Sequence, residues 1–274
     1  MTAATYQLEA SSEEIVVAEQ FVCARLKARA MTDYPGSLPV DLASAYRSQE
    51  AAIARIGEPI GGWKVTAEFS PALQAQYNER RMIGPAFASN IRVAGAGEIV
   101  ECPVFENGFA AFEPEIVIRV GTTASADKIE WTIDDAITMI GDLYVGVEIA
   151  SSPLPTLLQL GAAALASDFG GNFGIVVGPS ISGWRDLKNL GARCFIDDQL
   201  VGEGEISIRE GPLTAFAHVL SACARRGRPL RAGALITTGT ITYAHHIRPG
   251  QSSRFIYDHH GELRCHAVAA SPRR

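Results

Sequence analysis

Hydrophobic positions recur at helical spacing in the first part of the chain and at strand spacing in most of the remainder. The segment from Ser11 to Glu14 has the pattern of a helix start, ahead of an amphipathic stretch over 15–30. Pro39-Val40-Asp41 opens a second helical pattern that runs to residue 54, and Pro35-Gly36 separates the two. These features predict a helical N-terminal region over residues 1–58.

Beyond this region the chain consists of short apolar runs separated by glycine, proline and asparagine, which is typical of strands. The predicted strands are 62–66, 98–103, 112–120, 143–149, 234–240, 253–257 and 263–269. Helical patterns return at 133–140, 157–166 and 212–225. We therefore predict an α+β protein in which the helical N-terminal region is followed by a β-rich domain over residues 59–274.

Two acidic residues stand out in the apolar strand pattern of 112–120. Glu113 and Glu115 are two positions apart, so on a strand they share a face, with their carboxylate-bearing carbons roughly 6 to 7 Å apart. The opposite face of the strand is apolar and consists of Pro114, Ile116, Ile118 and Val120. Like charges this close raise each other's pKa unless a positive charge lies between them, and a divalent cation with oxygen ligands meets that need.

A third acid, Glu148, lies near the end of an otherwise uncharged strand pattern, 143–149. An unpaired buried carboxylate would cost several kcal/mol, so Glu148 requires a cation or a proton. Three carboxylates on two strands favour Mg²⁺ or Mn²⁺ over zinc. The alternative, which the spacing leaves open, is that the first two acids face water and that Glu148 pairs with Arg119 or Lys64.

Lys64 lies in the apolar, glycine-rich run Gly61-Gly62-Trp63-Lys64-Val65. The two glycines allow the backbone to approach another segment closely. A lysine in this setting can hold a positive charge near a carboxylate or oxyanion, or form a Schiff base. The alternative is an edge-strand lysine that keeps the protein soluble.

Composition restricts the partners and the cellular compartment. The formal net charge of −6 over 274 residues argues against nucleic acid or an anionic membrane as the main partner, because both require a basic surface. Five scattered cysteines without a CxxC motif do not form a disulfide framework. The chain has no basic residue before Arg25 and no apolar run of membrane-spanning length. We therefore expect a cytoplasmic protein with reduced thiols and a small-molecule substrate.

A series of short motifs resembles, in its order, the 2-keto-4-pentenoate hydratase branch of the fumarylacetoacetate hydrolase superfamily. The motifs are Ala45-Tyr46-Arg47-Ser48-Gln49, Gly62-Trp63-Lys64, Phe112-Glu113-Pro114-Glu115, Val147-Glu148, Ser167-Asp168, Gly202-Glu203-Gly204 ahead of Gly211-Pro212-Leu213, Thr238-Gly239-Thr240 and Arg248-Pro249-Gly250. Each motif is weak alone, and the specificity lies in their shared order from about Ala45 to Ala269.

The resemblance implies a mixed β-sandwich or roll with a central metal site, which makes 59–274 the catalytic domain. It implies that Glu113, Glu115 and Glu148 hold Mg²⁺ or Mn²⁺. The implied reaction adds water to a 2-hydroxy-2,4-dienoate to give a 4-hydroxy-2-oxo acid, as in meta-cleavage catabolism of aromatics. Lys64 would then support the negative charge of the substrate, and Asp168 would transfer a proton or orient Lys64. Relatives of this kind commonly form homo-oligomers.

Some segments depart from the family pattern. The family often has Gly-x-Lys-x-Gly and Ala-Asp-Asn where this chain has Lys64-Val65-Thr66 and Ser167-Asp168-Phe169, and the segment 68–85 differs from the usual substrate-facing loop. Thr240 is a candidate for binding the substrate carboxylate, although a plain turn role is favoured. The departures leave three alternatives open: a decarboxylase of a 4-oxalocrotonate-like diacid, for which Arg80 and Arg81 could bind the second carboxylate, a carbon–carbon hydrolase of an acylpyruvate, or a non-catalytic companion subunit.

Overall fold

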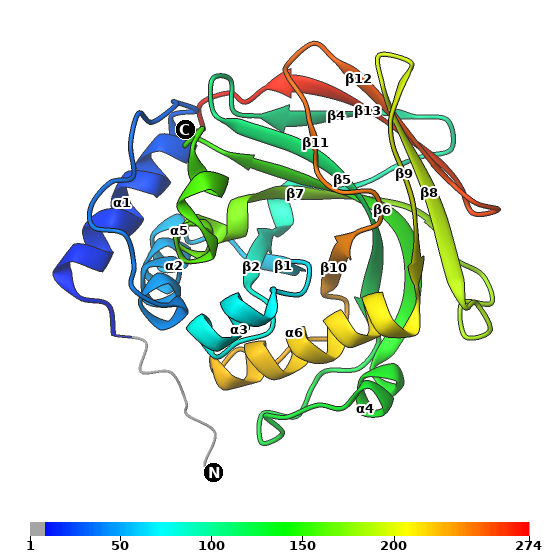
Figure 1. Cartoon of the computed structure of the whole chain (residues 1–274), viewed down its shortest axis with the longest axis horizontal. Helices are drawn as coiled ribbons and strands as arrows, with labels where there is room; N and C mark the ends of the chain where they lie inside the picture. Colours follow the sequence, from blue (N-terminus) through cyan, green and yellow to red (C-terminus); the bar gives the residue numbers. More distant parts are fainter. Residues whose placement is uncertain (1–8, 274) are drawn as a thin grey trace.

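Two β-sheets form the body of the protein in the computed structural model, which describes residues 9–273 (Figure 1). The larger sheet has the order β2 (Ile83–Phe87), β1 (Ile60–Val65), β10 (Leu235–Thr240), β5 (Phe109–Val120), β6 (Ile140–Ser152), β7 (Asn172–Ser180) and β3 (Ile91–Val93), with β11 (His245–His246) paired to β5. The smaller sheet has the order β4 (Ile99–Val104), β13 (Gly261–Ala269), β12 (Ser252–Tyr257), β8 (Asn189–Ile196) and β9 (Gln199–Ser207).

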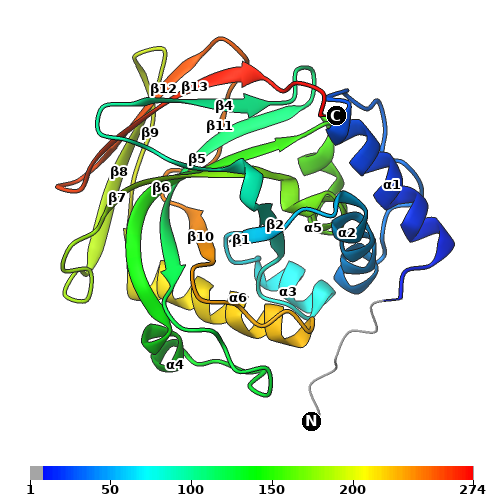
Figure 2. The same ribbon diagram turned by 180° about the vertical axis from the view of Figure 1, so that it is seen from behind.

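The centre of the larger sheet is the antiparallel pair of β5 and β6, whose register runs from Phe109 opposite Ser152 to Val120 opposite Ile140. One face of β5 packs against the smaller sheet, where the rings of Phe112 and Phe255 lie 6.4 Å apart between centroids. Figures 1 and 2 show the long strands curving around β10, β1 and β2, so the other face of β5 lies on the concave side. Both faces of this pair are therefore covered, and charged residues on them lose contact with water.

The N-terminal helices begin and end at capping signals. Helix α1 (Ser12–Leu26) has a capping box in which the Ser11 hydroxyl accepts a hydrogen bond from the Glu14 amide and the Glu14 carboxylate accepts one from the Ser11 amide. Helix α2 (Leu42–Ile56) is capped by Asp41 and ends at Gly57. The sequence prediction of two helices is correct, but α1 starts and ends about one turn earlier than predicted. The cap at Ser11 accounts for the earlier start.

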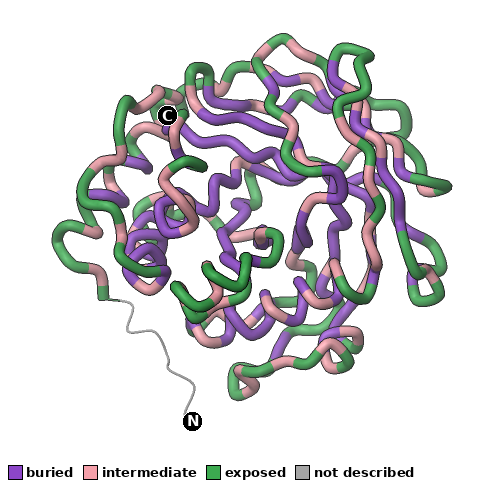
Figure 3. Tube along the Cα trace, in the orientation of Figure 1, coloured by how far each residue is buried: buried purple, intermediate pink, exposed green. Residues whose placement is uncertain are grey.

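These helices pack directly on the sheets. One continuous hydrophobic cluster contains Val22 of α1, Tyr46 of α2 and Trp63 of β1 together with the residues between the two sheets. Figure 3 shows the buried positions running through the centre of the molecule, with exposed positions concentrated in the outer loops. A division of the chain at residues 58 and 59 stays a prediction.

The remaining α-helices are shorter. They are α3 (Pro71–Tyr77), α4 (Ile133–Thr138), α5 (Ala162–Ser167) and α6 (Thr214–Arg225). Helix α5 lies beside α2 (Figure 1). The predicted helix over 157–166 is split into a short 3₁₀ turn, Leu157–Leu160, and α5 at Gly161, whose φ is +89°. No helix within residues 9–273 combines the length and hydropathy needed to cross a membrane.

Candidate metal centre

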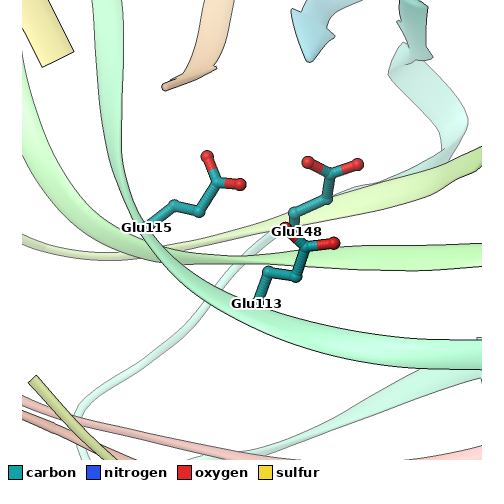
Figure 4. Close-up of side chains that lie close together, drawn as sticks. All are labelled: Glu113, Glu115 and Glu148. Carbon is teal, nitrogen blue, oxygen red and sulfur yellow. The ribbon is translucent and has the colours of Figure 1, made fainter. Parts of the chain in front are cut away.

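Three glutamates meet on the concave face of the larger sheet (Figure 4). Glu113 of β5 is paired directly with Glu148 of β6, and Glu115 lies two residues further along β5, opposite Gly146. One carboxylate oxygen from each residue lies within 4.8 Å of the others. Oxygens this close can bind a single cation, which agrees with the hypothesis of a three-carboxylate site on two strands.

The cluster is buried, so the solvated-face alternative is wrong. Glu115 and Glu148 are fully buried, and Glu113 is half-buried. The Oε1 atom of Glu148 accepts a hydrogen bond of 3.1 Å from the Asn172 amide, and its Oε2 accepts one of 3.3 Å from the Thr237 hydroxyl. These bonds determine the orientation of the Glu148 carboxylate, which lies close to the carboxylates of the other two glutamates (Figure 4).

The Glu115 carboxylate is only half satisfied by protein groups. Its Oε2 accepts a 2.7 Å hydrogen bond from the Gly239 amide, whereas Oε1 has no hydrogen-bond partner among the described residues. Gly239 has a φ of +100°, a conformation that favours glycine and that brings its N–H toward the cluster. A buried carboxylate oxygen without a partner is costly, and a bound cation would remove that cost.

Electrostatics point to the same need for positive charge. Burial, with the added charge of Glu148, raises the pKa of Glu113 to about 7 and raises the pKa of Glu115 well above its ordinary value. Burial alone would lower the pKa of Lys64, but the neighbouring Glu148, Glu113 and Glu115 outweigh it, so the pKa is raised and the ammonium stays charged. One lysine cannot balance the negative charge of three carboxylates, and a divalent cation would supply the missing positive charge.

Lys64 lies inside the site. Its Nζ is 3.3 Å from Glu148 Oε1, and the residue is 5% exposed. Strand β1 is hydrogen-bonded to both β2 and β10, so the interpretation of Lys64 as an edge-strand lysine is wrong. Of the two partners considered for Glu148, the structure selects Lys64, because Arg119 forms an ion pair with Asp142 instead.

Asp168 lies at the end of α5 in an ion pair with a residue that sequence reasoning did not single out. The Arg25 guanidinium, from the last turn of α1, donates 2.5 Å and 2.9 Å hydrogen bonds to the two Asp168 oxygens. Burial raises the pKa of Asp168, and Arg25 opposes that shift. The carboxylate therefore faces Arg25, and its assignment to proton transfer stays a prediction.

The three predicted substrate-binding residues already have protein partners. The Thr240 hydroxyl donates to the Tyr243 carbonyl at 2.9 Å, which is the turn role that the sequence favoured. Arg80 pairs with Glu68 at 2.7 Å. Arg81 donates to the Thr66 carbonyl at 2.9 Å and lies 3.7 Å from the same glutamate. The two arginines line a cavity of about 500 Å³ whose lining includes none of the three clustered glutamates.

Sequence reasoning missed the residues that hold the glutamates in place. Thr237 directly precedes the Thr238-Gly239-Thr240 motif, and only Thr240 of that motif was selected as a candidate. Asn172 follows Gly170-Gly171, which signals a tight turn but carries no local sign of a contact with Glu148. These contacts depend on how the strands pair, which spacing along one strand does not show.

Comparison with known structures identifies the fold. It matches 4-oxalocrotonate decarboxylase from Pseudomonas putida G7 complexed with calcium and acetate, with 22% identity, a TM-score of 0.74 and coverage of 93% of this chain and 97% of that one. It also matches fumarylpyruvate hydrolase from Pseudomonas aeruginosa in complex with Mn²⁺ and pyruvate (16% identity, TM-score 0.57, 76% and 89% coverage). A third match is 5-carboxymethyl-2-hydroxymuconate delta-isomerase from Mycobacterium smegmatis (15% identity, TM-score 0.54, 77% and 81% coverage).

No family model matches the chain, and no curated protein sequence does. The neighbours named here are a decarboxylase, a hydrolase and an isomerase, and their match supports the expected mixed α+β fold. Identities of this size establish the shared fold. They do not show whether this chain is a hydratase, as the sequence motifs suggest, or has the activity of one of these neighbours.

Proposed function

We propose that the protein is a divalent-metal-dependent hydro-lyase that adds water to a 2-hydroxy-2,4-dienoate and gives a 4-hydroxy-2-oxo acid. The observation that carries the proposal is the buried cluster of Glu113, Glu115 and Glu148 beside Lys64, with one Glu115 oxygen left without a partner among the described residues. The shared fold with enzymes solved with Ca²⁺, Mg²⁺ and Mn²⁺ adds support for a divalent cation.

The three glutamates would hold Mg²⁺ or Mn²⁺ through carboxylate oxygens, the donors that both ions prefer. When bound, such a cation supplies a Lewis acid that stabilises negative charge on the 2-oxygen of the substrate. Within the chain itself, Asn172 and Thr237 hold the Glu148 carboxylate in a fixed orientation. The Gly239 amide does the same for Glu115.

Lys64 is the positive charge that the chain provides beside this cluster. Its ammonium remains protonated and buried, so it can bind the carboxylate or the 2-oxygen of the substrate without competition from bulk water. In the proposed reaction the dienol first becomes an α,β-unsaturated ketone, water then adds at C4, and a proton at C3 restores the ketone. Asp168 stays a candidate for one of these proton transfers, and Thr240 for contact with the substrate carboxylate.

Decarboxylation of a 2-oxo diacid is the second candidate, because the fold matches two structures of 4-oxalocrotonate decarboxylase, one of them complexed with magnesium and adipate. A second substrate carboxylate would need a cation at the far end of the substrate. Arg80 and Arg81 both lie near Glu68, so a diacid that used them would have to compete with that carboxylate. This contact argues against Arg80 and Arg81 as the binding site for a second carboxylate.

Three substrates separate the candidate activities. The loss of ultraviolet absorbance of 2-hydroxypenta-2,4-dienoate, 4-oxalocrotonate and an acylpyruvate would be followed with Mg²⁺, with Mn²⁺ and with a chelator. Fast, metal-dependent turnover of the first substrate supports the hydratase, and preference for either of the others replaces it. Failure of all three with tight Mn²⁺ binding rejects the substrate class alone, whereas failure with no Mn²⁺ binding favours a non-catalytic companion subunit.

We also propose that the protein acts in the cytoplasm as a homo-oligomer, with the catalytic centre in residues 59–274 and neither nucleic acid nor membrane as a partner. The acidic net charge of −6 supports the last point. Light scattering of the purified protein tests the assembly directly, and a monomer at micromolar concentration would reject it.

A further inference from the structure

Arg25 binds both ends of one turn next to the candidate metal centre. Its guanidinium donates to the two carboxylate oxygens of Asp168 and, at 3.3 Å, to the Asp168 carbonyl. The same group donates at 3.0 Å to the Asn172 carbonyl and at 3.2 Å to the Ser151 carbonyl. The side chain is 9% exposed and lies over the rings of Phe105 and Phe169. A lysine could not reach this many acceptors at once.

The turn between these ends has an unusual backbone. Phe169, Gly170 and Gly171 follow one another with φ values of +54°, +68° and +67°. A bulky aromatic residue rarely adopts a positive φ, and such a conformation persists only where its surroundings hold it. The bonds from Arg25 to Asp168 and Asn172 close the turn from outside, and the Gly171 amide donates to the Asp168 carbonyl at 2.8 Å from within.

The turn touches the candidate site at two points. A Cβ on Gly170 would lie 3.0 Å from Cδ of Lys64, so the backbone of the turn packs against the lysine stem. The residue that ends the turn, Asn172, donates its side-chain amide to Glu148 at 3.1 Å. A shift of the turn would therefore move the two residues whose charged groups lie 3.3 Å apart in the site.

We propose that Arg25 is a positioning residue for the metal centre, acting through the 169–171 turn on Lys64 and through Asn172 on Glu148. This inference rests on the proposed function, because it assumes that the glutamate cluster binds a divalent cation. It assigns the N-terminal helix α1 a part in the site, although α1 supplies none of the three carboxylates. Residues outside the ligand set that orient a ligand commonly change metal affinity by about 10- to 100-fold.

The test is a Mn²⁺ titration followed by the electron paramagnetic resonance signal of free Mn²⁺, together with the melting temperature of each metal-free variant. Arg25→Met should weaken Mn²⁺ binding by about tenfold. Arg25→Lys keeps the charge beside Asp168 and serves if the first variant does not fold; it should weaken binding less. Arg55→Met, which removes an exposed arginine paired with Glu19, is the matched control and should leave the affinity unchanged.

A double-mutant cycle tests the route. Asn172→Leu should by itself weaken Mn²⁺ binding, and Arg25→Met should then cost less than it does in the wild-type background, because the connection to Glu148 is already broken and only the contact of the turn with Lys64 remains. Losses that multiply would reject the route through Asn172. Wild-type affinity in folded Arg25→Met or Arg25→Lys would overturn the proposal while the proposed function stands. If wild-type protein binds no Mn²⁺, the proposed function fails and nothing remains for Arg25 to position.

Discussion

Glu113 and Glu148 are directly opposite each other across the antiparallel pair of β5 and β6. Like charges in this position ordinarily destabilise a sheet, and here they lie on a face that is covered by other strands. The repulsion is relieved in part by Lys64, 3.3 Å from Glu148, and in part by the raised pKa of Glu113. Two opposed glutamates are not expected in a sheet that has only a structural role. Their presence is therefore a reason to expect a bound cation.

We expect Glu115→Gln to abolish metal-dependent activity with little loss of stability. Burial already raises the pKa of Glu115 well above its ordinary value, so the amide resembles the protonated form that the metal-free protein favours. The amide lacks the charge that binds a cation, so Mn²⁺ affinity should fall by at least about 100-fold. Activity, Mn²⁺ titration and the melting temperature measure these effects, with exposed Glu101→Gln on β4 as control. Near-normal turnover would reject the ligand set.

Lys64→Met should reduce turnover more than it reduces metal affinity. A bound cation can neutralise Glu148 when the ammonium is lost. The negative charge of the substrate, in contrast, is no longer stabilised by Lys64, the only lysine proposed for that role. We expect kcat to fall by about 100-fold or more, the usual effect of removing a group that stabilises a developing oxyanion. Titration of Mn²⁺ into both proteins separates the two effects. Equal losses in affinity and turnover would instead make Lys64 part of the metal site alone.

The sequence predicted the acidic cluster because alternation along a strand is a local property. Glu113 and Glu115 share a face in any strand. Glu148 stands out because the rest of its strand pattern, 143–149, is uncharged. The register that places Glu148 against Glu113 depends on the long connection between β5 and β6 and on neighbouring strands, so it could not be predicted. Arg25 and Asp168 are 143 residues apart, and their pairing depends on the complete fold.

Strand β9 shows why parts of the smaller sheet were missed. Its glycines Gly202 and Gly204 alternate with the acidic residues Glu203 and Glu205, so it lacks the apolar alternation that indicates a strand. The structure gives the glycines a reason. A Cβ on Gly204 would lie 2.4 Å from the Ile241 carbonyl, and one on Gly202 would lie 2.3 Å from the His245 ring. The chain that follows β10 comes so close to β9 that a side chain has no room at these two positions. Sequence spacing does not show this approach.

The pH dependence of metal binding follows from the raised pKa of Glu113, about 7 against an ordinary 4.5. Between these values the folded metal-free protein keeps a proton that the unfolded chain releases, so its free energy of unfolding falls as pH rises through this window. Metal binding needs the deprotonated carboxylate, so stabilisation by Mn²⁺ should grow over the same window. We expect the Mn²⁺-induced rise in melting temperature to be larger at pH 8 than at pH 6. An equal rise at both would contradict the assignment.

Two adjacent threonines allow a matched test of the groups that orient Glu148. The Thr237 hydroxyl donates to Glu148, whereas the Thr238 hydroxyl donates to the Ile116 carbonyl at 2.8 Å and not to a glutamate. Both residues are buried, so replacing either by valine should cost about 1 kcal/mol of unfolding free energy. Only Thr237→Val should also weaken Mn²⁺ binding, by about tenfold, because it frees one Glu148 oxygen to rotate. Isothermal titration with Mn²⁺ and thermal melting of the two variants separate these effects. If both variants lose affinity equally, the loss comes from disturbed packing of β10, and the orienting role of Thr237 is rejected.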